Sequence, residues 1–239
     1  VLSTLQLTHA LRGAMMAGCA QPLPAWLSGH QADGKPSREA HVALLPLAFT
    51  GTEHADGRLL GVALALPRSV SATDAARVLQ PWLRDAADGL PREFPVFDGR
   101  AMECTAMLDL RERPPATLDV EAWVKPSRRW ATVTPIALDR HADGWDGATD
   151  VVADACVHIG LPRPVEVQLH PNSCIAGVPP SYRFAPIERK RSGGRLAHTH
   201  AVITFDCDVQ GPVVLGAGRF RGYGLCKPLP PQPERGGHG

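Results

Sequence analysis

The residues best suited to chemistry lie near the carboxyl end of the chain, in the stretch Gly216–Pro228. It reads Gly-Ala-Gly-Arg-Phe-Arg-Gly-Tyr-Gly-Leu-Cys-Lys-Pro, so glycines, cations and aromatic rings alternate along it. Glycine lets the backbone turn sharply and approach a ligand closely, because it has no Cβ. Arginine offers forked donors that suit phosphate, and an aromatic ring can stack on a nucleobase. We call this stretch the glycine loop and expect it to contact a nucleic acid; the alternative is a hairpin loop with solvated arginines.

Neither of two common phosphate-binding motifs accounts for the glycine loop. Three residues separate Gly218 from Gly222, whereas the dinucleotide-binding fingerprint has two, and no P-loop Gly-Lys-Ser/Thr is present. A second basic segment, Arg189-Lys-Arg191, could follow a nucleic-acid backbone without reading its sequence, or form a solvated surface loop. The candidate RNA contacts in these two segments are Gly216, Gly218, Arg219, Arg221, Gly222, Tyr223, Gly224, Lys227, Arg189, Lys190 and Arg191.

The overall composition is that of a soluble globular protein, with 239 residues, 44% hydrophobic and 21% charged. The formal net charge is only +1, so affinity for nucleic acid must come from local patches. Six cysteines without a Cys-x-x-Cys pair predict buried free thiols in a reducing cytosol, and no zinc site. No apolar run reaches transmembrane length and no export signal is evident, so we expect a cytoplasmic protein with no membrane partner.

The elements that must position these residues follow from hydrophobic periodicity and from turn residues. Ser3 and Gln6 have the spacing of a capping box, and the helix that follows ends at Gly18. Asp56-Gly57 predicts a hairpin turn between two apolar strands, and Pro81 is expected to kink the second helix. For the first half the predicted elements are a helix to residue 18, strands at 41–49 and 58–66, a helix from 71, and a strand at 101–110.

A polar, proline-containing segment up to Lys125 is expected to link this half to a second one with a similar order of elements. The predicted elements of the second half are strands at 129–138, 164–169, 197–206 and 224–228 and one helix at 148–159. This order is typical of the ferredoxin-like βαββαβ plan. We therefore predict an α+β fold of two tandem ferredoxin-like units, at 1–113 and 126–229, the first without its opening strand. The glycine loop lies in the second unit, and residues 230–239 are expected to form a disordered tail.

Residues 28–228 resemble the processing half of the fused subunit of type I-G (formerly I-U) CRISPR effector complexes, within the RAMP superfamily. Short segments in a characteristic order carry the resemblance: Ser28-Gly-His30, Asp33-Gly-Lys-Pro36, His41-Val-Ala-Leu-Leu-Pro-Leu47, His54-Ala-Asp-Gly-Arg58, Thr134-Pro-Ile-Ala-Leu-Asp-Arg140, Gly160-Leu-Pro-Arg-Pro164 and the glycine loop. The resemblance implies cleavage of CRISPR repeat RNA without a metal or other cofactor, leaving a 2′,3′-cyclic phosphate. It also implies that the chain stays bound to the guide RNA among other effector subunits.

Nucleases of that family usually carry a histidine near the end of the first helix or in the loop after it. The resemblance therefore makes His30 and His41 the candidate catalytic residues, without deciding which is the base and which the acid. Histidine suits both roles because its pKa lies near neutral pH. Lys35 and Arg38 lie between them and could hold the phosphate. Each histidine could instead be an ordinary solvated loop or strand-end residue.

His198 and His200 would share one face of a strand, and they could line an RNA cleft. A metal-dependent hydrolase built on them is a weaker hypothesis, because no third ligand is evident. The main rival to the nuclease is a non-catalytic subunit with the same fold that holds one end of the guide RNA. The glycine loop does not separate these two hypotheses, because both kinds of protein carry it. The histidines between the first helix and the hairpin favour the enzyme.

Overall fold

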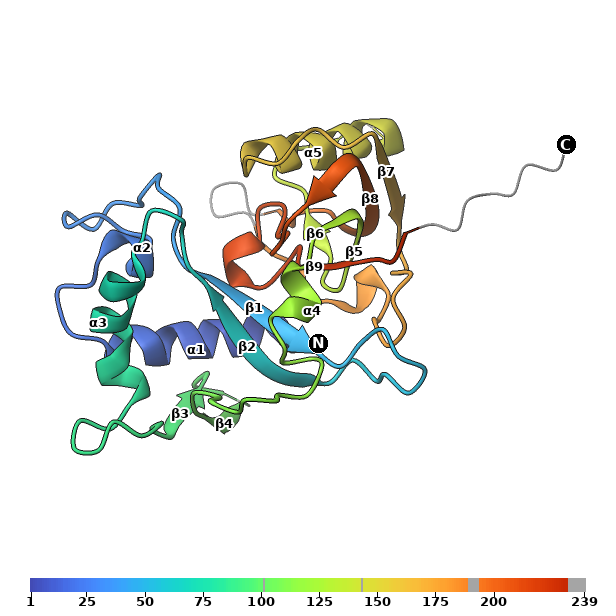
Figure 1. Ribbon diagram of the computed structural model, residues 1–239. Coiled ribbons are helices and arrows are strands. Elements are labelled where there is room, and N and C mark those ends of the chain that lie inside the picture. The colour runs from blue at the N-terminus through green and yellow to red at the C-terminus, as the bar shows by residue number, and fades with distance from the viewer. Residues whose placement is uncertain (101, 143, 189–193, 232–239) are drawn as a thin grey trace, which may run out of the picture.

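A computed structural model of the chain describes residues 1–100, 102–142, 144–188 and 194–231. The fold is a mixed α+β structure with antiparallel sheets (Figure 1). The amino-terminal half contains α1 (Thr4–Gly18), α2 (Ala25–Ser28), β1 (Ala43–Ala48), β2 (Leu59–Ala65), α3 (Ala72–Leu83), β3 (Phe94–Phe97) and β4 (Glu103–Ala106). The carboxyl-terminal half contains α4 (Glu121–Val124), β5 (Ser127–Thr132), β6 (Ile136–Ala137), α5 (Gly144–His158), β7 (Glu166–His170), β8 (His198–Val209) and β9 (Cys226–Pro228). Two short 3-10 helices are η1 (Ser181–Arg183) and η2 (Arg219–Arg221).

The first half is built around the predicted hairpin, in which β1 and β2 pair antiparallel from Ala43 opposite Ala65 to Ala48 opposite Leu59. The Ser71 hydroxyl accepts a hydrogen bond from the amide of Asp74 at the start of α3, a cap that stabilises a helix by about 1 kcal/mol. The capping box predicted at Ser3 is not formed, because the Ser3 side chain makes no cap hydrogen bond. Instead, the Thr4 hydroxyl donates to the carbonyl oxygen of Val1.

The strand predicted at 101–110 corresponds to β4, and it pairs with β3, a strand that the sequence pattern did not predict. β4 pairs antiparallel with β3, which packs on α1, and this hairpin is separate from β1–β2. Pro95 in β3 hides the strand pattern, because proline removes a backbone donor and is rare inside sheets.

In the second half the strands form one antiparallel sheet in the order β7-β8-β5-β9. The strand predicted at 129–138 is interrupted: β5 pairs with β8 and β9, and after the bend that contains Pro135 the two residues of β6 pair with β8 again. Helix α5 packs on one face of the sheet and lies at the end of the molecule opposite β3–β4 (Figure 1).

Three apolar cores hold the layers together. One lies between α5 and the second sheet around Trp130, and another lies among α1, α3 and the hairpin around Met15. The third core joins the halves: Leu45 and Leu47 of β1 pack with Ala131 of β5 and with Leu225. The face of the second sheet opposite α5 is therefore partly covered by the first half, because β1 presents apolar side chains to it.

Two other expectations need correction. The segment before Lys125 is not a loose linker, because it forms α4 and buries Trp123, whose indole donates to the carbonyl oxygen of Thr117 at 2.8 Å. The cysteines are free, but Cys104, Cys174 and Cys207 are exposed rather than buried. In the part of the chain that the structure describes, no helix has the length and apolar character needed to cross a membrane.

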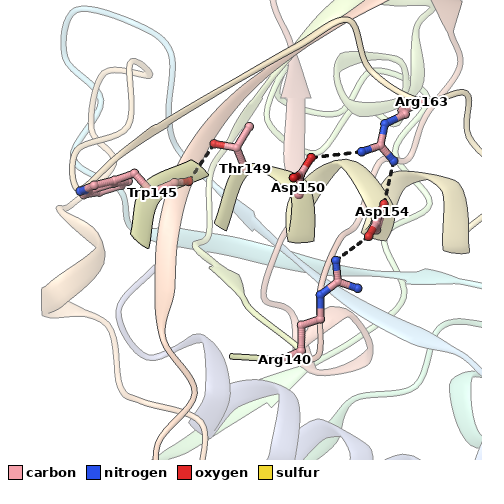
Figure 2. A network of polar contacts seen from close by, with 6 residues as sticks. All are labelled: Arg140, Trp145, Thr149, Asp150, Asp154 and Arg163. Carbon is pink, nitrogen blue, oxygen red and sulfur yellow. Dashed lines mark hydrogen bonds and ion pairs between the residues drawn. The ribbon is translucent and has the colours of Figure 1, made fainter. Parts of the chain in front are cut away.

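Ion pairs tie the outer face of α5 to the segments before and after it (Figure 2). Asp154 accepts from Arg140 at 2.5 Å and from Arg163 at 2.7 Å, and Arg163 also reaches Asp150 at 3.2 Å. The hydrogen bonds from Arg140 and Arg163 lower the pKa of Asp154. Two of the segments that carry the family resemblance, 134–140 and 160–164, therefore meet at one carboxylate.

We expect Asp154→Asn to lower the thermal midpoint more than Asp150→Asn does, because two guanidinium groups lose their shared carboxylate. The difference should shrink as salt is added, since exposed pairs are screened. Because the pKa of Asp154 is depressed in the folded state, its contribution is present above pH 3.8 and is lost as the pH falls further. Scanning calorimetry at low and high salt measures both effects; equal midpoints for the two variants at low salt would contradict the prediction.

Candidate functional site

The glycine loop is packed inside the molecule rather than open to solvent. Gly216, Gly218, Gly222 and Gly224 are all buried. Gly224 has φ +73°, and a Cβ there would collide with the carbonyl oxygen of Leu215. The glycines are thus required for close packing of the backbone, and the prediction that they approach RNA directly does not match their burial.

Two predicted RNA contacts in the loop have structural partners instead. Tyr223 is fully buried and its hydroxyl donates to the carbonyl oxygen of Ala185 at 2.6 Å, so its ring cannot stack on a base. The ammonium group of Lys227 donates to the carbonyl oxygen of Thr50 at 3.1 Å and lies over the ring of Trp123. Arg221 is exposed and Arg219 is half-buried, so these two cations remain accessible.

Threonines from both halves hold the glycine loop in place. The Thr8 hydroxyl of α1 donates to the carbonyl oxygen of Arg221 at 2.9 Å, and the Thr134 hydroxyl donates to the carbonyl oxygen of Gly222 at 2.8 Å. η2, the 3-10 turn in this loop, packs against β1 and α1. The loop of the second half is therefore seated on the first half, beside the start of β1.

This seating brings the loop to one of the predicted histidines. His41, just before β1, stacks on Phe220 with ring centroids 3.7 Å apart and an interplanar angle of 28°. The guanidinium carbon of Arg219 lies 4.5 Å from the centroid of the same phenylalanine ring. A residue of the first half and two residues of the second half thus form one cluster.

His30 and Arg12 join the cluster through the carbonyl oxygen of Ser28. Arg12 of α1 donates to that oxygen at 2.5 Å, and Nδ1 of His30 lies 3.0 Å from it. Because a carbonyl only accepts, Nδ1 of His30 carries the proton in this hydrogen bond and Nε2 is left for other contacts. Gly29 (φ +73°) lies between Arg12 and His41: a Cβ at this position would be 3.2 Å from Nη2 of Arg12 and 3.3 Å from Cδ2 of His41.

The electrostatic environment of His41 is cationic. Burial lowers the pKa of His41 and Arg12 lowers it further; the backbone of Glu39 raises it, and Arg219 and His30 lower it by smaller amounts. Nδ1 of His41 is buried and has no hydrogen-bond partner. Neutral imidazole is therefore the favoured form at pH 7, beside two permanent positive charges.

This cluster, Arg12, His30, His41, Arg219 and Phe220, can bind an anion and move a proton. Arg12 and Arg219 act on His41, and the carboxylate of Asp139 acts on Arg219, so positive charge is in excess and a phosphate group would balance it. The sequence pointed to His30, His41 and Arg219, but it missed Arg12, which is one cation on an ordinary helix and has no distinguishing spacing. Phe220 was noted only as a ring able to stack on a base.

The other predicted site residues lie outside this cluster. Lys35 is exposed and paired with Asp33 at 2.8 Å, and Arg38 is exposed. Nε2 of His198 donates to the carbonyl oxygen of Ser181, and Nε2 of His200 donates to that of Pro179, so each Nε2 atom is engaged by the backbone. Arg189, Lys190 and Arg191 lie outside the described residues.

We expect Arg12→Gln to raise the pKa of His41, because it removes the largest charge contribution, although burial remains and keeps the rise partial. The titration of the His41 ring proton by NMR measures the shift. Arg77→Gln, at an exposed arginine of α3, is the matched control and should leave the midpoint unchanged. An unchanged or lower His41 pKa in Arg12→Gln would contradict this placement of Arg12.

His200 should make the fold sensitive to acid. Burial lowers its pKa to about 4, and Nδ1 lies 2.9 Å from the hydroxyl of Thr132. Because the pKa of His200 is lower in the folded state than in the unfolded state, protonation of this ring favours unfolding. The free energy of unfolding should therefore be unaffected by His200 above pH 6.5 and fall by roughly 3 kcal/mol as the pH drops to 4. His200→Gln keeps a donor for Pro179 and should flatten this slope in urea unfolding curves; a slope equal to that of the wild type would contradict the assignment.

The fold and the cluster define a mixed α+β protein in which residues of both halves form a cationic cluster around His41. Comparison with protein families agrees with a nucleic-acid role: the family model for "CRISPR-associated protein, GSU0054 family" matches residues 1–148 and 145–228. The chain belongs to this CRISPR-associated family, which assigns it a role in a CRISPR system and so in antiviral defence. Neither the curated proteins nor the solved structures contain a match to the chain.

Proposed function

We propose that this chain is an endoribonuclease that cuts CRISPR repeat RNA at the Arg12–His30–His41–Arg219 cluster. The observation that carries the proposal is a neutral, half-buried histidine beside the guanidinium groups of Arg12 and Arg219. An RNA phosphate is the anion that a CRISPR-associated protein would bring to such a place.

The strand order of the second sheet supports a ferredoxin-like fold, and with it the proposed activity. The order β7-β8-β5-β9, with every neighbouring pair antiparallel, is the order of a ferredoxin-like sheet. In the same plan the opening strand lies between the third and the fourth strand. A first unit without that strand would therefore leave β3 separated from β1–β2, as observed. We therefore place the chain among the RAMP-type proteins of type I-G systems.

The reaction would be an attack by the substrate's own 2′-hydroxyl on the adjacent phosphorus. The 2′-oxygen–phosphorus bond forms, the bond to the 5′-oxygen breaks, and the products are a 2′,3′-cyclic phosphate and a 5′-hydroxyl. His41 would act as the base, because its lowered pKa keeps it neutral. Arg12 and Arg219 would stabilise the charge that builds up on the phosphorane. The doubly protonated form of His30 would give its Nε2 proton to the leaving 5′-oxygen, while its Nδ1–H stays hydrogen-bonded to the carbonyl oxygen of Ser28.

After cleavage the protein would keep the guide RNA and join other subunits of a type I effector complex. Arg221, exposed next to the cluster, would contact the RNA backbone, as would Arg38 of the loop before β1. Lys35 would join them if RNA displaces Asp33.

A second candidate function is a non-catalytic subunit that holds one end of the guide RNA. The flat stacking of His41 on Phe220 favours it, since a purely structural histidine would pack in the same way. Incubation of the wild-type protein with a labelled repeat hairpin in EDTA separates the two. Cleavage supports the nuclease, whereas tight binding without cleavage, with and without added divalent metal, supports the holder.

A further inference from the structure

A hollow lies away from the His41 cluster, on the second sheet, between β7, the turn after it and β8. It has a volume of about 390 Å³, within the range of small-ligand sites. Its lining includes Gln168, His170, Asn172, Cys174, His200 and Val202. We call it the β7–β8 pocket.

The cross-strand register explains how these side chains come together. Gln168 lies opposite Val202, and His170 lies opposite His200, so all four stand on the sheet face opposite α5. The turn after β7 forms the wall, and it is anchored where the Ser173 hydroxyl donates to the carbonyl oxygen of Thr132 at 2.7 Å. The pocket is therefore preformed.

The lining is uncharged and combines polar groups with the apolar side chains of Leu169, Ala201 and Val202. No Lys, Arg, Asp or Glu is among the lining residues, and burial keeps His200 neutral at pH 7. Nδ1 of His170 lies 2.9 Å from the backbone amide nitrogen and 3.1 Å from the carbonyl oxygen of Asn172, so Nδ1 is engaged by the turn and Nε2 is the ring nitrogen available to a ligand. Nε2 of Gln168 donates to Glu166 at 2.8 Å, which leaves its carbonyl oxygen as an acceptor.

One cation stands at the edge of this uncharged pocket. Arg129 of β5 lies opposite Thr204 of β8, two residues along β8 from the pocket residue Val202. Its positive charge acts on Cys174, where it lowers the pKa of the thiol and partly offsets the effect of burial. The one carboxylate in the same cross-strand row, Glu166, is already engaged by Gln168. A flat, neutral group with donors and acceptors at its edge fits the pocket, and an anion attached to that group fits beside Arg129.

We propose that the β7–β8 pocket binds one unpaired nucleobase of the RNA, with the phosphate of that nucleotide at Arg129. The inference rests on the proposed RNA substrate, and it adds a site that reads a base away from the cleavage cluster. An uncharged lining excludes phosphate from the pocket itself, and hydrogen bonds to a base edge discriminate among bases by about 1–3 kcal/mol each.

Cys174 provides a direct test, because it lines the pocket and is exposed, while Cys104 and Cys207 are exposed elsewhere. The full chain is alkylated with iodoacetamide at pH 8.5, where the thiol, whose pKa is raised by burial, reacts measurably. Reactions run with and without repeat RNA that carries a 2′-deoxy sugar at the cut site, and with each of the four mononucleotides. Mass spectrometry follows each cysteine.

We expect bound RNA to slow the alkylation of Cys174 several-fold and to leave Cys104 and Cys207 unchanged. Gln168→Leu should weaken RNA binding by about 5- to 150-fold, the equivalent of about 1–3 kcal/mol, whereas the matched exposed control Gln210→Leu should not. Equal alkylation rates with RNA bound would overturn the inference and indicate another occupant, such as a protein segment. If repeat RNA with the natural ribose at the cut site is still cleaved in that case, the proposed nuclease activity stands without the base-binding pocket. If the protein binds no RNA, both proposals are wrong.

Discussion

Replacing His41 with asparagine should lower the rate of repeat RNA cleavage by about 10²- to 10⁴-fold, the usual contribution of general acid–base catalysis. Asparagine is polar and smaller than histidine, so Phe220 keeps a neighbour while the titratable nitrogen is lost. RNA affinity should change little, because Arg12 and Arg219 still face the phosphate. Single-turnover cleavage of a labelled hairpin in EDTA, with anisotropy for binding, measures the two effects separately.

The matched control is His54→Asn, because His54 is exposed in the turn between β1 and β2, at the other end of β1 from His41. It should cut at the wild-type rate. A His41→Asn protein that cuts as fast as the control would remove His41 from the mechanism. A loss of binding as large as the loss of rate would instead assign it a role in holding RNA.

Replacing Gly224 with alanine should destabilise the protein by at least about 3 kcal/mol. Alanine at a left-handed φ costs roughly 1–2 kcal/mol by itself. Its Cβ would also collide with the carbonyl oxygen of Leu215, so the backbone must move. That movement breaks the hydrogen bonds from Gly224 to Pro135 and from Leu215 to Gly224, each contributing about 1 kcal/mol. Urea unfolding followed by circular dichroism measures the change in free energy.

Gly34→Ala separates the two causes. Gly34 has φ +79°, close to that of Gly224, but nothing lies within 4 Å of its Cβ position. This control should lose only the conformational part, about 1–2 kcal/mol. Equal losses in the two variants would mean that the close packing of the glycine loop contributes nothing to stability.

The sequence predicted correctly those elements whose formation depends on a local pattern of residues. The helix that ends at Gly18, the β1–β2 hairpin and the Ser71 cap all depend on neighbours within a few residues. It missed β3, because four residues with a central proline carry no period, and it missed the break after β5. For the site, the family resemblance selected His30 and His41. The sequence also predicted RNA contacts at Tyr223 and Lys227, but the side chains of both donate hydrogen bonds to backbone carbonyl oxygens of the protein.

The sequence by itself therefore determined the α+β class, most element positions and the stretch of glycines and cations on which the molecule depends. Only the tertiary structure decided what those glycines do, because their burial results from packing the second half on α1 and β1. It also decided the composition of the candidate site. Arg12 and His41 are 29 positions apart, and Phe220 is 179 positions beyond His41, so no spacing rule connects them. They meet because threonines of both halves hold the carbonyl groups of the loop against the first helix, a long-range contact that a local pattern cannot encode.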